Sequence, residues 1–90
     1  MAASRMVAGA MNTSIPERFR ESIDLYVSDR IPPGGFLTAV LSNNLTEAFY
    51  RADDEAIAHM LGIVSYCYND IPRTSWGSPT RVREWLQGTR

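Results

Sequence analysis

Apolar residues recur every three or four positions along most of this chain, a spacing that predicts amphipathic helices. The alternation of apolar and polar residues that is typical of strands is not found in any segment. We therefore expect an all-α fold, in which about five short helices form one compact bundle. The helical pattern covers residues 14–88, and we expect residues 1–13 to be a disordered N-terminal extension.

The first expected helix runs from about residue 15 to residue 30. Ser14 precedes Glu17 by three positions, which is the arrangement of a capping box at a helix start. Pro32 and Pro33 end the helix, because proline has no backbone N–H and disfavours helical geometry in the residue before it. The apolar side of this helix consists of Phe19, Ile23, Tyr26 and Val27.

Two short helices are expected next. The Gly34–Gly35 pair allows the chain to reverse, and the apolar residues of 36–41 then predict a mostly buried helix. Asn43 or Asn44 can cap the helix that follows, over residues 45–52.

The fourth expected helix is the longest and starts at the acidic run of residues 53–55, where carboxylates favour a helix N-terminus. It ends before Pro72, and its apolar pattern predicts the central helix of the bundle. The last helix begins after Ser78, with Pro79 at its first position. On the fourth helix the buried stripe is expected to contain Ile57, Met60, Leu61, Val64, Cys67 and Tyr68, with Ile63 and Tyr66 beside it. On the last helix the docking residues are Val82, Trp85 and Leu86.

Length and charge narrow the possible functions. A chain of 90 residues buries only about 60–65% of its unfolded surface, so we expect marginal stability and association into a homo-oligomer. Nine basic residues are interspersed with ten acidic ones, and a net charge of −1 disfavours nucleic-acid binding. No apolar run approaches the ~20 residues that cross a bilayer, so no membrane association is expected. A single cysteine fits a reducing cytosol.

Residues for covalent or metal chemistry are scarce. Cys67 is the only cysteine and His59 the only histidine, and eight positions along a helix separate them by about two turns. Spacing places no third group to orient such a pair for nucleophilic catalysis. One cysteine and one histidine also fall short of a four-ligand zinc site. The acidic run 53–55 is better explained as a helix start, so we expect no enzyme activity, no metal and no cofactor.

Several short motifs occur along the chain, namely I-P-P-G-G-F-L-T-A-V-L at 31–41, N-N-L at 43–45, R-A-D at 51–53, Y-N-D at 68–70 and W-G-S-P at 76–79. In this order they resemble a family of small phage and prophage proteins. The resemblance covers roughly Ile15 to Leu86. It implies a viral origin, an accessory role and a location in the host cytoplasm, and it transfers no activity onto particular residues.

Polar and aromatic residues gather at the ends of the expected helices and form the candidate ligand site. Aromatic planes stack on bases, arginine forks pair with phosphates, and amides contact base edges. Together with the phage resemblance, they indicate a protein that counters host antiviral defence by sequestering a nucleotide-derived signalling molecule. The candidate ligand-binding residues are Thr38, Asn43, Asn44, Arg51, Tyr68, Asn69, Arg73 and Trp76, with Ser75 beside them.

Structural explanations and other functions remain open. The glycine pair can be a plain turn, the two asparagines a cap and a left-handed residue, and Trp76 can pack under the last helix. A second function is a protein-binding inhibitor of a host defence enzyme or effector. Its contact face would be the acidic side of the first helix or the start of the fourth. A third is a DNA-binding regulator of the helix-turn-helix type, which the acidic composition disfavours.

Overall fold

In the computed structural model, the residues described are 14–88, and they form six α-helices and one 3-10 turn with no strand among them. The expected all-α bundle is confirmed, with one helix more than predicted. The disordered extension predicted for residues 1–13 lies outside the described residues. The elements are α2 (Glu17–Asp29), α3 (Gly35–Leu41), α4 (Leu45–Arg51), α5 (Asp54–Ala58), α6 (Met60–Asp70), η1 (Arg73–Ser75) and α7 (Pro79–Leu86).

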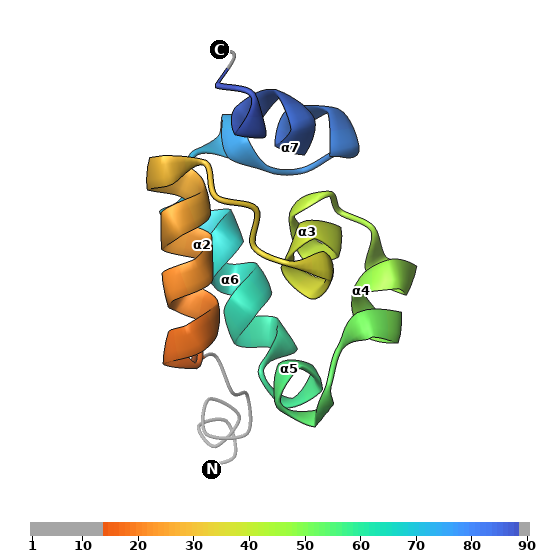
Figure 1. The fold of residues 1–90 in the computed structure, drawn as a ribbon. Coiled ribbons are helices and arrows are strands. Elements are labelled where there is room, and N and C mark those ends of the chain that lie inside the picture. The colour runs from red at the N-terminus through yellow and green to blue at the C-terminus, as the bar shows by residue number, and fades with distance from the viewer. Residues whose placement is uncertain (1–13, 89–90) are drawn as a thin grey trace, which may run out of the picture.

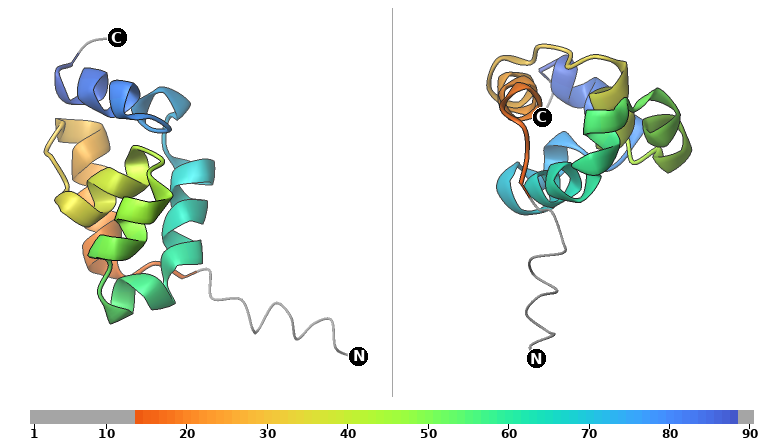
Figure 2. Two further views of the ribbon diagram at one scale, coloured as in Figure 1. Left: turned by 90° about the vertical axis from the view of Figure 1, so that its right-hand side faces the viewer. Right: turned by 90° about the horizontal axis from the view of Figure 1, so that it is seen from below.

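Helices α2 and α6 run side by side in the same direction (Figure 1). The hydroxyl of Tyr66 on α6 donates a hydrogen bond to the Asp24 carboxylate on α2, which joins the two helices. Helices α3 and α4 pack against each other, α7 lies across one end of the bundle, and α5 lies at the opposite end (Figures 1 and 2).

All six helices contribute to one apolar core. The ring centroids of Phe19 on α2 and Phe36 on α3 lie 5.6 Å apart in a tilted arrangement, which is favourable for aromatic rings. On α2, α3 and α7, the buried residues lie on the faces that the sequence predicted. The buried apolar residues are Phe19, Ile23, Tyr26, Leu37, Ala39, Val40, Leu41, Ala48, Ala56, Ile63, Cys67 and Val82.

The predicted capping box at the start of α2 is wrong. The residue before the helix is Pro16, which is extended at φ −59° and ψ 146°, and no side chain caps the helix. Ser14 therefore lies too far ahead of the first turn to accept from its N–H groups. Its hydroxyl oxygen instead lies 3.3 Å from Nδ1 of His59.

The other caps are confirmed. The side chains of Asn44, Asp53 and Ser78 each accept a hydrogen bond from the backbone N–H three residues later, at 3.2, 2.8 and 3.1 Å. Asn43 adopts a left-handed conformation with φ 62°, so the two asparagines serve as a left-handed residue and a cap. Each of these caps is an interaction between residues three positions apart, which explains why the sequence predicts where the helices start.

The fourth expected helix is divided in two. His59, at φ −111° and ψ 17°, separates α5 from α6, so within residues 14–88 the longest helix is α2 with 13 residues, not this segment. The predicted buried stripe is also wrong in part, because the core takes the face that carries Ile63 and Cys67. Apolar residues surround α6, so periodicity alone could not select the face that packs. The predicted core residues left exposed are Ile57, Leu61, Val64 and Tyr68.

Candidate functional site

The structure divides the predicted ligand-binding residues between two surface hollows. Thr38, Asn44 and Arg51 line one of them. Asn69 lines neither hollow. It is exposed, and its amide donates to the Ser65 carbonyl oxygen one turn earlier in α6. Ser75 is buried. The remaining predicted residues, Asn43, Tyr68, Arg73 and Trp76, line the other hollow.

This second hollow, which we call the Trp76 hollow, has a volume of about 400 Å³. That is within the range of about 300–1,000 Å³ typical of small-molecule sites. It lies where the turn after α3, the end of α6, η1 and the start of α7 meet. Its lining consists of Asn43, Tyr68, Ile71, Arg73, Trp76, Gly77 and Arg81.

Buried hydrogen bonds hold the segment that carries Arg73 and Trp76. The Tyr26 hydroxyl donates to the carbonyl oxygen of Ser75 at 2.6 Å, and the Ser75 hydroxyl donates to that of Pro72 at 2.6 Å. Burial raises the pKa of Tyr26 to about 12, so its phenol stays protonated and remains a donor. The segment is thus fixed to α2 through the core.

Trp76 combines the two roles that the sequence left open. Its ring is half-buried and packs against the core, and it also lines the Trp76 hollow. Its indole N–H makes no hydrogen bond with the residues at 14–88. The next residue, Gly77, donates its backbone N–H to the Leu41 carbonyl oxygen at 2.7 Å, which fixes the ring beside the end of α3.

Arg81 belongs to the site although the sequence analysis did not select it. Its Nη1 donates to the carbonyl oxygens of Arg73 and Trp76 at 3.4 and 3.3 Å, across the start of α7. Gly77 permits this close approach, because a Cβ there would lie 3.0 Å from Nη1 of Arg81. The sequence did contain a signal for Arg81. A helix that is capped by Ser78 carries the residue three positions later, Arg81, in its first turn.

The charges in the Trp76 hollow are positive and not neutralised. Arg73 and Arg81 make no ion pair with any residue of 14–88, and no carboxylate lines the hollow. The other hollow differs, because Arg51 donates to the Glu47 carboxylate and both residues line it. An anionic ligand therefore finds two guanidinium groups without carboxylate partners in the Trp76 hollow and a neutralised one in the other.

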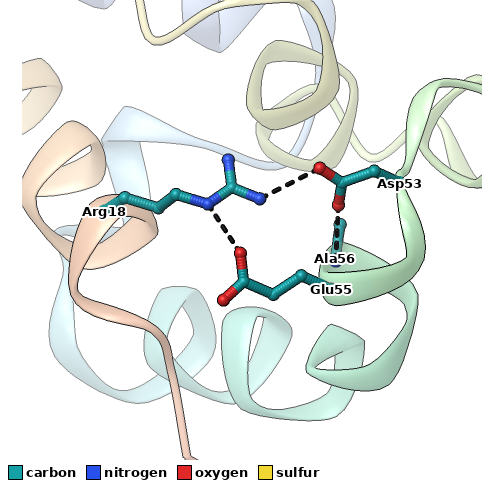
Figure 3. Close-up of polar contacts among 4 residues, drawn as sticks. All are labelled: Arg18, Asp53, Glu55 and Ala56. Atoms are coloured by element: carbon teal, nitrogen blue, oxygen red, sulfur yellow. Dashed lines mark hydrogen bonds and ion pairs between the residues drawn. The ribbon is translucent and has the colours of Figure 1, made fainter.

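The acidic run at the start of α5 has a structural role (Figure 3). Nε of Arg18 lies 2.7 Å from a carboxylate oxygen of Glu55, and its Nη2 lies 3.0 Å from one of Asp53. The backbone N–H of Ala56 donates to the other Asp53 oxygen and is the main cause of the lowered pKa of that carboxyl. Within the described part of the chain, no three His, Cys, Asp or Glu side chains lie together as they would to hold a metal ion.

The single cysteine is poorly placed for chemistry. Cys67 is fully buried in the core, and burial raises the pKa of its thiol to about 12. The thiol therefore stays protonated near neutral pH, whereas a nucleophile must be a thiolate. His59 lies at the junction of α5 and α6, beside Ser14.

Among residues 14–88, none of the helices has the length and apolar character needed to cross a membrane. No protein-family model, curated protein or solved structure matches this chain. A functional proposal therefore depends on the chemistry of the Trp76 hollow.

Proposed function

We propose that this protein binds a small anionic ligand with a planar ring in the Trp76 hollow and holds it without transforming it. The observation that carries the proposal is the presence of two arginines without carboxylate partners beside two aromatic rings, in one hollow of ligand size. Nucleotide-derived molecules have the matching features, namely phosphates and a flat base.

Each group in the hollow has a suitable partner on such a ligand. The guanidinium groups of Arg73 and Arg81 pair with phosphate oxygens. The rings of Trp76 and Tyr68 offer surfaces for stacking, and the Asn43 amide can donate to and accept from a base edge. Tyr68 is exposed and lines the hollow, so its ring is accessible to a bound base.

The biological role follows from the phage resemblance of the motifs at 31–41 and 76–79. We propose that the protein is a viral accessory protein that acts in the host cytoplasm. By binding a nucleotide-derived signal of antiviral defence, it lowers the free concentration of that signal. Such a function needs binding affinity and no catalytic residue, which is consistent with a buried, protonated Cys67.

Titration calorimetry tests the proposal directly, using cyclic dinucleotides, cyclic trinucleotides and cyclic ADP-ribose isomers as probes. We expect one of these classes to bind, and Arg73→Ala to weaken binding by at least about tenfold through loss of a charge-assisted contact. Arg83→Ala is the matched control, since this exposed arginine of α7 lies outside the hollow and its loss changes the net charge equally. Absence of heat with every probe would refute the proposal.

The alternative function, a protein-binding inhibitor of a host defence enzyme or effector, has less support. It was predicted to use the acidic side of the first helix or the acidic start of the fourth. At the latter surface Arg18 pairs with both Asp53 and Glu55, so one of the three negative charges of residues 53–55 is offset and the attraction for a basic partner is reduced. Affinity purification of the tagged protein from infected cells tests this alternative, which requires one host protein to be recovered in stoichiometric amount.

A further inference from the structure

The outer side of α6 is apolar although it faces solvent. Leu61, Val64 and Tyr68 follow one another at intervals of three and four residues, so they share one side of the helix. They are 41, 39 and 69% exposed. No charged residue occurs in α6 before its last position, Asp70. Surface helices usually present charged and polar residues to water, so an uncharged apolar side indicates a contact surface.

Helix α4 extends this surface. Leu45 and Phe49 are four residues apart on α4, and both are exposed. Leu45 and Val64 line a common hollow between α4 and α6, the two helices seen in the left view of Figure 2. We call the surface formed by Leu45, Phe49, Leu61, Val64 and Tyr68 the α4–α6 face.

The hollow in this face suits a protein side chain better than a small molecule. Its volume is about 80 Å³, and its other lining residues are Val40, Asn43, Asn44, Ala48, Met60 and Trp76. Small-molecule sites are usually about 300–1,000 Å³, so this one is too small for a nucleotide. An apolar side chain from a macromolecular partner would fill it and lose its contact with water.

The exposed area is close to what a stable protein interface requires. From their exposed fractions, the five residues present roughly 600 Å² per copy, while standard interfaces bury about 800 Å² per partner. Neighbouring residues at the rim would supply the difference. The face is therefore large enough for a specific complex.

Charge favours a second copy of the chain as the occupant. A two-fold contact places each residue near its own counterpart, so any charged residue close to the axis would meet a like charge. None of the five residues in the face is charged, whereas ion pairs at Arg18, Arg20 and Arg51 occur elsewhere on the described surface. A small domain also gains stability from the additional apolar burial.

We propose that the α4–α6 face binds a second copy of this chain across a two-fold axis, with the outer side of α6 at its centre. The proposal does not depend on a ligand in the Trp76 hollow. Tyr68 belongs to both surfaces, and Asn43 and Trp76 line both the Trp76 hollow and the hollow in this face. The experiment therefore leaves these three residues unchanged and alters Leu61 and Phe49.

The molar mass in solution, measured by sedimentation or light scattering over the micromolar range, tests the proposal. We expect twice the chain mass of 10.1 kDa for the unaltered protein. Leu61→Glu and Phe49→Glu should each raise the dimer dissociation constant by at least about tenfold, because a charge is buried against the partner. Circular dichroism checks that each variant remains helical.

Leu25→Glu is the matched control, because Leu25 is 44% exposed on α2, outside the α4–α6 face. We expect this variant to remain a dimer. A single-chain mass for the unaltered protein at every concentration would overturn the proposal. It would also be overturned by a dimer that persists in Leu61→Glu and Phe49→Glu, because the contact would then lie on another surface.

Discussion

Replacement of Tyr26 by phenylalanine tests how the core holds the Trp76 hollow in place. The ring of Tyr26 is fully buried on α2, and its hydroxyl donates to the Ser75 carbonyl oxygen at 2.6 Å. Its own backbone carbonyl oxygen accepts from Nε1 of Trp85 at 3.0 Å. Tyr26 therefore joins α2, η1 and α7. Phenylalanine keeps the ring and removes only the hydroxyl.

The expected cost comes from the carbonyl that loses its donor. An unpaired carbonyl oxygen in the interior costs about 1–3 kcal/mol of folding free energy. For a domain of this size, a loss of about 2 kcal/mol lowers Tm by roughly 8–16 °C. Since η1 carries Arg73 and leads into Trp76, we also expect Tyr26→Phe to weaken ligand binding.

Thermal unfolding followed by circular dichroism measures the change in Tm. Tyr50→Phe provides the matched control, because Tyr50 is 85% exposed and its hydroxyl makes no hydrogen bond with residues 14–88. We expect the control to leave Tm within about 1 °C, as is usual for a surface change. If Tyr26→Phe and Tyr50→Phe unfold at the same temperature, the buried hydrogen bond does not contribute as argued.

Three further predictions concern the core and the caps. The Cys67 thiol should react with a thiol reagent only in denaturant; rapid labelling of the folded protein would contradict its burial. Burial raises the folded-state pKa values of Cys67 and Tyr26 to about 12, above their unfolded values of about 8.5 and 10, so neutral groups are favoured in the fold. Stability measured by urea unfolding should thus begin to fall above about pH 8.5 and decline further as the pH rises towards 12, and a flat profile over that window would contradict this. Asn44→Ala removes the cap of α4 and should cost about 1 kcal/mol in the same assay, whereas exposed Asn69→Ala should cost less than about 0.5 kcal/mol.

The sequence predicted most of the residues of the candidate site from their types. It did not predict which of them lie together. Trp76 and Arg73 are close together in the chain, but the second positive charge of the hollow, that of Arg81, comes from the next helix. Arg51 pairs with Glu47 one helical turn earlier, a spacing of four residues that the sequence already contained. The absence of a carboxylate beside Arg73 and Arg81 depends instead on which elements meet in space, and residue type does not reveal this.

The sequence by itself determined the features that depend on neighbours within about four positions. These are the helical periodicity, the breaks at Pro32 and Pro72, and the caps at Asn44, Asp53 and Ser78. In each of these features the interacting groups are close in the chain, so a short sequence pattern is enough to predict the feature.

Only the tertiary structure decided which side of α6 is buried and which residues meet in the Trp76 hollow. Leu61 and Ile63 are both apolar residues of α6, yet one faces solvent and the other the core. The Tyr26 to Ser75 hydrogen bond joins residues 49 positions apart. Such choices depend on how all the helices fill one core together, and packing of that kind is a property of the whole chain that no local pattern contains.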